Sequence, residues 1–306
     1  MGSREQSSRS PDAIGGRFLG REFTSTTLSR RLGSCSLRQP MNDHPTAASL
    51  GAALHTRWLG RAFEWVAACA STNDLAAERA RAGAPDGLVV ATDSQSAGRG
   101  RMGRSWHSPA GENLYFSIVL RPSRPAAEIP PLTLLVGAAA ASALSGLGLA
   151  PRLKWPNDVQ LVDAAGRRRK VAGILTEMAS AGDRVQQVVV GVGLNVNGLE
   201  FPAELAERAT SLRRELGRPL ERAAVLAAVL DALEPLYQDF ERRGAAAAVA
   251  AFDDHAALPD RCRVSAPRES QGWLEGTALG VDADGALRLR DDHGTIHRVI
   301  SGELLP

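Results

Sequence analysis

The segment from residue 132 to residue 150 carries no charged side chain, and it limits the fold more than any other part of the chain. Its 19 residues are enough to cross a lipid bilayer as a helix. The segment is rich in alanine and glycine, however, and it lies between Pro131 and Pro151, which is typical of a helix packed closely inside a protein. We therefore predict a buried helix and no membrane-spanning segment, in a chain of 306 residues that is long enough to enclose it.

Short runs rich in β-branched residues alternate irregularly with Ala- and Leu-rich segments up to residue 257. The former predict strands and the latter predict helices. Because the helices do not follow the strands one by one, we expect a mixed sheet with helices packed on it, an α+β fold, rather than a regular βαβ array. The predicted strands cover 88–92, 115–120, 153 onward, 171–178 and 185–192, and the predicted helices cover 72–82, 132–147, 220–243 and 245–255.

A different pattern begins at residue 258, where short strand-like runs are separated by turns. Asp284-Gly285 and His293-Gly294 are dipeptides typical of tight turns between strands. This segment predicts a small β-barrel that is near the lower size limit for independent folding and therefore packs on the main domain. Its predicted strands cover 262–264, 272–279, 286–290 and 295–300.

The first 55 residues are predicted to be an extension. Residues 1–40 contain eight serines and seven arginines without a periodic apolar pattern, which is typical of disorder. They also lack the apolar stretch of a secretory signal. We therefore divide the chain into an extension at 1–55, a main domain at 56–257 and a small domain at 258–306.

Charge and cysteine usage exclude several classes of protein. The net charge of the chain is +2, and residues 1–40 contribute +4 of it, so the remainder is slightly acidic. Proteins that bind nucleic acid mainly through surface charge are basic. The cysteines Cys35, Cys69 and Cys262 are far apart, which argues against a disulfide framework or a thiolate metal site and favours a reducing compartment, the cytoplasm.

A loop after the strand predicted at 88–92 alternates glycine with arginine. Glycines let backbone amides approach a ligand closely, and arginines offer charged forks suited to phosphate or carboxylate. A solvated basic turn or an RNA-binding patch of the Arg-Gly-Gly type is the alternative, although such patches repeat and this one occurs once. The residues of interest are Gln95, Gly98, Arg99, Gly100, Arg101 and Arg104.

Only two of the 36 basic residues are lysines, Lys154 and Lys170. Where arginine supplies nearly every other positive charge, a lysine suggests a position that needs a compact ammonium group, although chance is the simpler explanation. Lys154 begins the sequence Lys-Trp-Pro-Asn-Asp, in which Asp158 is either a Mg²⁺ ligand or a turn cap. Lys170 precedes an apolar strand, where an anionic ligand would compensate the loss of water around the ammonium group.

Two further segments have both a structural and a functional interpretation. Gly191 and Asn195 follow valines of a predicted strand, where glycine permits close approach and asparagine can bind a ring, but where both residues also commonly make turns. Ser71, Thr72 and Asn73 begin a predicted helix, where they either cap it or face a ligand.

The six histidines form no hydrolytic or metal-binding motif. His293 and His297 are four residues apart, but in a region of strands and turns this spacing does not place them on one face. We therefore predict no histidine metal site.

Taken in order, these motifs resemble those of the biotin–protein ligase family, over residues 56–306. They are Ser-Thr-Asn at 71–73, Gln-x-Ala-Gly-Arg-Gly-Arg from 95, Lys-Trp-Pro-Asn-Asp at 154–158, Lys-Val-Ala-Gly-Ile-Leu from 170 and Gly-x-Gly-x-Asn at 191–195. The resemblance implies a catalytic domain related to class II aminoacyl-tRNA synthetases at 56–257 and an SH3-like barrel at 258–306. The family's DNA-binding helix-turn-helix is expected to be missing, and with it a DNA partner.

The resemblance also implies the reaction. The biotin carboxylate attacks the α-phosphate of ATP to give biotinyl-5′-AMP, and a lysine of a biotin carboxyl carrier protein then captures the biotinyl group. Lys170, Arg99 and Arg101 are the expected catalytic residues, because they can stabilise the charge that develops on the phosphate. The expected ligand-binding residues are Ser71, Thr72, Asn73, Gln95, Gly98, Arg99, Gly100, Arg101, Arg104, Asn157, Lys170, Gly173, Gly191 and Asn195, with Asp158 as the Mg²⁺ ligand.

Two alternative functions remain open at this point. A lipoate or octanoate ligase shares the implied fold and chemistry but not the Gly-Arg-Gly-Arg loop. A regulator that binds nucleic acid would use the same arginines on phosphates, against the slight acidity of residues 41–306. No membrane partner is expected, and a homodimer is one assembly that the resemblance allows.

Overall fold

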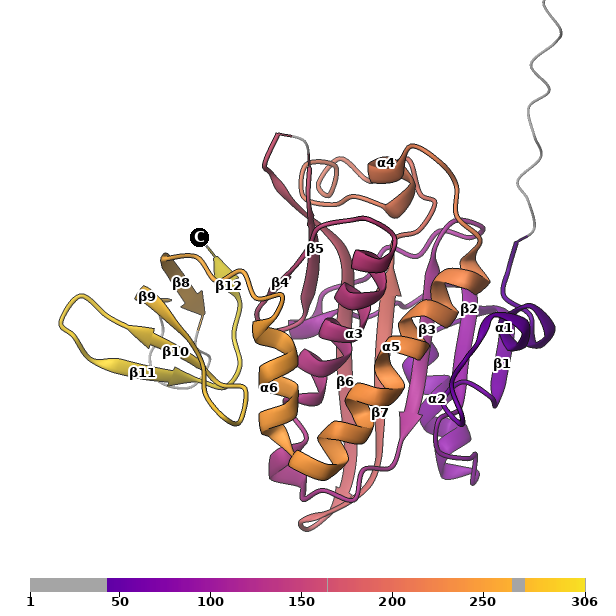
Figure 1. The fold of residues 1–306 in the computed structure, drawn as a ribbon, viewed down its shortest axis with the longest axis horizontal. Coiled ribbons are helices and arrows are strands. Elements are labelled where there is room, and N and C mark those ends of the chain that lie inside the picture. The colour runs from indigo at the N-terminus through magenta and orange to yellow at the C-terminus, as the bar shows by residue number, and fades with distance from the viewer. Residues whose placement is uncertain (1–42, 164, 266–272, 306) are drawn as a thin grey trace, which may run out of the picture. The chain divides into compact units, whose positions relative to one another are not determined.

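The computed structural model describes residues 43–163, 165–265 and 273–305. A seven-stranded mixed sheet forms the centre of its larger part (Figure 1). The strand order is β1-β2-β3-β7-β6-β5-β4, in which β1 and β2 are parallel and all other neighbours are antiparallel. The strands are β1 (Phe63–Cys69), β2 (Val89–Gln95), β3 (Leu114–Leu120), β4 (Pro151–Lys154), β5 (Asp158–Val162), β6 (Arg168–Ala181) and β7 (Arg184–Leu194).

Helices α3 (Leu132–Gly146) and α5 (Arg222–Arg243) cover one face of this sheet and lie in front of β6 and β7 in Figure 1, and α6 (Ala245–Asp253) packs beside these two helices. Alternate strand residues point to this face, among them Val188, Val190 and Val192 of β7, and all three are buried in the main core.

The uncharged segment forms the buried helix α3, as predicted. The stretch Ala126–Gly146 is long and apolar enough to cross a membrane, and an 18-residue window of it has a mean hydropathy of 1.5, but 67% of that window is buried inside the protein. Its side chains pack in the main core, so the helix supplies that core rather than a membrane anchor.

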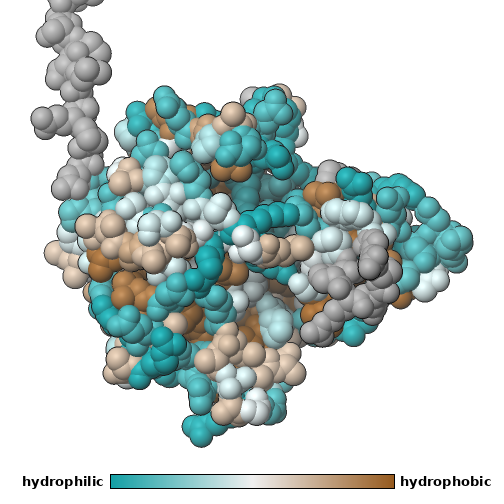
Figure 2. All heavy atoms as spheres, turned by 180° about the vertical axis from the view of Figure 1, so that it is seen from behind, coloured by the Kyte–Doolittle hydropathy of each residue, from teal (hydrophilic) through white to brown (hydrophobic). Residues whose placement is uncertain are grey.

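The opposite face of the sheet is only partly covered. Helix α2 (Thr72–Arg81) packs Ala76 and Ala80 on Val90, Val119 and Val189. Figure 2 shows this side of the molecule, where hydrophobic and hydrophilic residues are both exposed. Beyond Val189 the side chains of β7 on this face are replaced by glycines, and the space above them becomes the functional pocket.

A separate five-stranded antiparallel sheet forms the small C-terminal domain, in the order β11-β10-β9-β8-β12. Its strands are β8 (Arg261–Ser265), β9 (Trp273–Val281), β10 (Leu287–Arg290), β11 (Ile296–Val299) and β12 (Leu304–Leu305). Gly285 and Gly294 adopt the positive φ angles that the turn dipeptides predicted, +79° and +86°. This agrees with the expected SH3-like domain.

Two sequence predictions need correction. Strands β1 and β5 were not predicted, since Phe63–Cys69 contains alanines and a glutamate and β5 follows directly on the turn that ends β4. The extension also ends earlier than residue 55. Thr46 caps helix α1 (Ala47–Ala53), whose Leu50 is buried against the main core, and Asp43 pairs with Arg222. Residues 1–42 lie outside the described part of the chain.

Candidate active site

A pocket of about 370 Å³ lies on the partly covered face of the sheet. Strands β6 and β7 form its floor, and the N-terminus of α2, the loop after β2, the β4–β5 turn, a segment at 201–209 and the C-terminal residues 302–305 form its walls. Its lining includes seven arginines or lysines and two carboxylates, so the pocket is suited to a polyanion. The cations are Arg99, Arg101, Arg104, Lys154, Arg168, Lys170 and Arg208, and the carboxylates are Asp158 and Glu303.

Glycines make the floor of the pocket low enough for other groups to lie on it. A Cβ atom on Gly191 would stand 2.1 Å from Asn73 Oδ1, and one on Gly193 would stand 2.3 Å from the Trp106 ring. Gly173, which pairs with Gly193 across the sheet, lies under the same ring and beside the Lys170 ammonium group. Side chains at these positions would displace the groups that shape the pocket.

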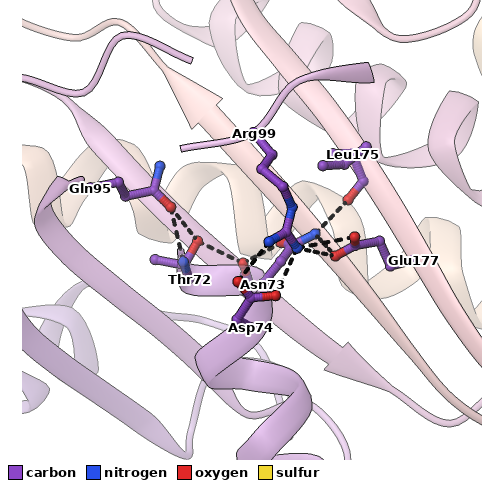
Figure 3. A network of polar contacts seen from close by, with 8 residues as sticks. Thr72, Asn73, Asp74, Gln95, Arg99, Leu175 and Glu177 are labelled. Carbon is purple, nitrogen blue, oxygen red and sulfur yellow. Dashed lines mark hydrogen bonds and ion pairs between the residues drawn. The ribbon is translucent and has the colours of Figure 1, made fainter. Parts of the chain in front are cut away.

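The start of α2 joins a polar network at one end of the pocket (Figure 3). Gln95 Oε1 accepts hydrogen bonds from the backbone and hydroxyl of Thr72, at 2.9 and 3.2 Å. The Ser117 hydroxyl lies 2.6 Å from Asn73 Oδ1 and 2.8 Å from Thr72 Oγ1. Because Ser117 has one proton to donate and each of these oxygens has two lone pairs, both oxygens can accept from N–H groups of a ligand.

Ser71 is the N-cap of α2, but its side chain makes no capping hydrogen bond and lines the pocket instead. The geometry therefore leaves the Ser71 hydroxyl free of a capping role, and its contact with a ligand stays a prediction.

Arg99 does not present a free charge to the pocket. Its guanidinium group donates to both oxygens of Asp74, at 2.6 and 2.8 Å, and to Glu177 at 3.1 Å (Figure 3). These carboxylates raise the pKa of Arg99, and Arg99 in turn lowers the pKa of Asp74. Arg99 lines the pocket, and its predicted catalytic role would require the guanidinium group to leave these two carboxylates.

The two lysines meet at the other end of the pocket. Lys170 Nζ lies 2.6 Å from Asp158 and 5.1 Å from the centre of the Trp106 ring. Lys154 lines the same end, and burial is the main cause that lowers its pKa, although Asp158 and Glu303 oppose the shift. The lining of the pocket by both lysines supports the inference from their rarity in the sequence.

Two further arginines of the loop connect it to the C-terminal domain. Arg101 donates to Ser301 Oγ at 3.0 Å and to the carbonyl oxygen of Gly302 at 3.4 Å. Arg104 pairs with Glu303, which lowers the pKa of that carboxyl group. Burial lowers the pKa of Arg101. Arg101 has hydrogen-bond partners but no ion pair among the described residues, so its charge is available to an anion.

All but one of the predicted binding residues line the pocket, Asn157 and Asn195 among them. The Asn157 side chain donates one N–H to Ile174 O and the Asn195 side chain donates one to Thr210 O, both at 3.0 Å, which leaves each amide a second N–H group and its oxygen for a ligand. Gly98 does not line the pocket, and a Cβ atom there would meet Trp106 O at 2.8 Å.

The residues that could hold a metal ion are few. Within the described part of the chain, no group of three His, Cys, Asp or Glu side chains is arranged to hold one. His297 binds Asp291 instead, at 2.7 Å. Asp158 is a single carboxylate, so it fits Mg²⁺ only as an ion that also takes oxygens from phosphates and water.

Sequence reasoning missed several pocket residues. Trp106 covers the glycine floor with an indole N–H that has no partner among the described residues, and it follows the Gly-Arg loop closely enough to have been suspected. Ser117 does not line the pocket but supports Thr72 and Asn73, and as one buried hydroxyl within a run of apolar residues it was a usable signal. Residues 302–305 could not have been found, because no local pattern shows that the chain returns there.

Comparison with known proteins agrees with this geometry. Residues 65–195 match the Biotin/lipoate A/B protein ligase family, and residues 263–304 match the Biotin protein ligase C terminal domain. The bifunctional ligase/repressor BirA of Bacillus spizizenii is 34% identical over 290 residues, covering 94% of this chain and 86% of the relative. The biotin–[acetyl-CoA-carboxylase] ligase of Paracoccus denitrificans is 34% identical over 241 residues, covering 73% and 92% respectively.

A solved structure shows the same fold. The biotin protein ligase from Aquifex aeolicus, in complex with biotin and ATP, superimposes with a TM-score of 0.65 at 27% identity and covers 80% of this chain and 98% of its own. The motifs, the two-domain fold and these relatives lead to one conclusion: the chain belongs to the biotin protein ligase family and is an enzyme of the ligase class.

Proposed function

We propose that this ligase carries out both half-reactions of protein biotinylation in the pocket on the glycine floor. The single observation that carries the proposal is the polarity of that pocket. One end offers the hydroxyl and amide oxygens of Thr72 and Asn73, which suit the N–H groups of the biotin ureido ring. The other end carries Lys154, Lys170 and Arg101, which suit a carboxylate and a triphosphate.

In the first step, a biotin carboxylate oxygen attacks the α-phosphorus of ATP, the bond to the β-phosphate breaks and pyrophosphate leaves. Negative charge grows around the α-phosphate as this happens. Lys170 and Arg101 would stabilise this charge from fixed positions, and Lys170 would exchange Asp158 for the substrate. Biotinyl-5′-AMP is the product.

In the second step, the amine of a lysine on a biotin carboxyl carrier protein attacks the carbonyl carbon of biotinyl-5′-AMP after losing a proton. An amide bond forms and AMP leaves. The arginine loop and the C-terminal wall would cover the mixed anhydride until the acceptor arrives, which limits its hydrolysis by water.

Mg²⁺ would arrive with ATP and be held by Asp158 together with phosphate oxygens. The ion would neutralise the leaving pyrophosphate. This assignment requires Lys170 to release Asp158, since the two groups lie 2.6 Å apart in the structure.

The two domains would have different roles in the reaction. Residues 56–257 would carry the chemistry, and residues 258–306 would close one wall of the pocket. We propose a cytoplasmic location and expect no DNA partner. A salt-sensitive binding to nucleic acid in the absence of ATP and biotin would contradict the latter expectation.

The test is ATP-dependent pyrophosphate release measured with biotin, lipoate and octanoate. Biotin should be strongly preferred, and a preference for lipoate or octanoate would overturn the proposal. Lys170→Ala and Lys170→Arg should both lose most of this activity, because Arg keeps the charge but replaces the compact ammonium group with a broad plane. Arg167→Met is the matched control, since Arg167 pairs with Asp163 on the surface and does not line the pocket.

A further inference from the structure

Two carboxylates outside the pocket lining hold the arginine loop. Asp74 lies on α2 and Glu177 on β6, and Arg99 of the loop is bonded to both (Figure 3). Neither carboxylate lines the pocket, although Arg99 does. The loop thus has one attachment to the main sheet through Arg99 and another to the C-terminal domain through Arg101 and Arg104.

Glu177 has a second partner that Asp74 lacks. Its Oε2 accepts a hydrogen bond of 2.7 Å from the Asn73 side chain, which also donates to the carbonyl oxygen of Leu175. These two bonds fix the orientation of the Asn73 amide, because they occupy its nitrogen and turn its Oδ1 toward Ser117 and Gly191. Glu177 therefore touches both the ring-binding end of the pocket and the loop.

We propose that Glu177 is a positioning residue that makes the ring-binding end and the arginine loop one unit, while Asp74 supports the loop alone. The proposal rests on the proposed function, in which Asn73 faces the biotin ring. It follows from counting acceptors. The Glu177 carboxylate serves Asn73 and Arg99 at once, because Oε2 accepts from both and Oε1 accepts from Arg99 as well. A glutamine in its place would turn its NH2 group toward either the Asn73 amide nitrogen or the Arg99 guanidinium group, and both of these are donors.

The experiment compares Glu177→Gln with Asp74→Asn, which each remove one carboxylate charge from Arg99. Glu177→Gln should raise the KM for biotin about tenfold and change the KM for ATP by less than about twofold, the tenfold change corresponding to one lost charge-assisted bond. Asp74→Asn should leave both KM values within about twofold. Equal changes in the two KM values for Glu177→Gln, or the same biotin effect in Asp74→Asn, would overturn the proposal.

A readout without activity tests the loop attachment separately. Trypsin cleaves after arginine, so the rate of cleavage after Arg99, Arg101 and Arg104 in the unliganded protein reports how firmly the loop is held. Both variants should be cleaved faster than the wild type, and unchanged cleavage in Glu177→Gln would overturn the role assigned to this residue. Melting temperatures close to that of the wild type would show that the variants are folded.

A failure of the proposed function would be seen in the wild-type protein and not in the variants. If the wild-type protein released pyrophosphate with lipoate rather than biotin, the assigned substrate would be wrong. The same comparison of KM values would then be made with lipoate, and a selective effect of Glu177→Gln would still support its positioning role.

Discussion

The two faces of strand β7 show how one segment of chain can serve stability and function separately. On the face covered by α3 and α5, the strand places Val188, Val190 and Val192 in the core. On the opposite face Val189 packs under α2, but Gly191 and Gly193 then leave room for Asn73 and Trp106. The two-residue repeat of a strand allows one face to stay fully packed while the other gives up side chains for a pocket.

The valines and glycines of this strand therefore have different roles on its two faces. Valine on the helix-covered face contributes free energy of folding through apolar contact. Glycine on the pocket face contributes close approach and costs some stability in a strand. Substitutions on the two faces should therefore separate activity from stability.

The largest effect is expected for Gly191→Ala, which should lower pyrophosphate release with biotin by about 100-fold or more, because its methyl group would displace the Asn73 side chain. The sheet itself should stay intact, since the change adds one methyl group on the pocket face. Steady-state kinetics together with thermal melting checks this. A variant with the wild-type KM for biotin would contradict the role of Gly191 in shaping the pocket.

A smaller effect is expected for Lys154→Met, which should slow biotinyl-5′-AMP formation by about 30-fold, because it removes a cation suited to the triphosphate end of the pocket. Transfer from supplied biotinyl-5′-AMP to the carrier protein should change much less, since no pyrophosphate leaves in that step. Arg152→Met on the same strand, whose guanidinium group binds the carbonyl oxygen of Pro151, is the control. Equal losses in both steps would argue against this assignment.

On the helix-covered face, Val190→Ala should lower the free energy of unfolding by about 2 kcal/mol, through lost apolar burial and a small cavity. Activity per folded molecule should be close to that of the wild type. Denaturant titration measures the first quantity and kinetics at a temperature well below the melting point measures the second. A selective rise in the KM for biotin would show that the faces are not independent.

The smallest effect concerns His255, which lies just after α6 with its Nε2 atom 3.3 Å from Ser142 Oγ of α3. Burial lowers its pKa from the ordinary value of 6.5, so the unfolded state binds a proton more readily than the folded state. The protein should therefore be most stable above about pH 6.5 and lose part of that stability as the pH falls toward the lowered pKa. His255→Gln should show a weaker fall in melting temperature between pH 7 and pH 5.

Much of the fold could be predicted from local patterns. The uncharged run at 132–150 predicted α3, and the Val-rich run at 185–192 predicted β7, because a segment that is apolar on both sides has to be buried. Strand β1 could not be recognised, since its residues are only partly buried at the edge of the sheet. Helix α1 was hidden in a segment that begins with polar residues, and only its contact with α5 shows why it folds.

The candidate site was less predictable in its details than in its location. Motif order identified the loop, both lysines and the glycine floor. Local sequence could not show that the carboxylates capturing Arg99 come from α2 and β6, because Asp74 and Glu177 are far apart in the chain. The same limit applies to Asn157 and Asn195, whose amides each donate one bond to a backbone carbonyl group that only the fold brings near.

The position of Gly302, Glu303, Leu304 and Leu305 in the pocket wall has a consequence for biosynthesis. During translation the strands that form the pocket floor are synthesised before these residues, so the pocket still lacks one wall when its floor is complete. Arg101 and Arg104 then have no C-terminal partners. A nascent chain at that stage would be unable to enclose an adenylate, so we expect biotinylation to begin only after the small domain has been synthesised.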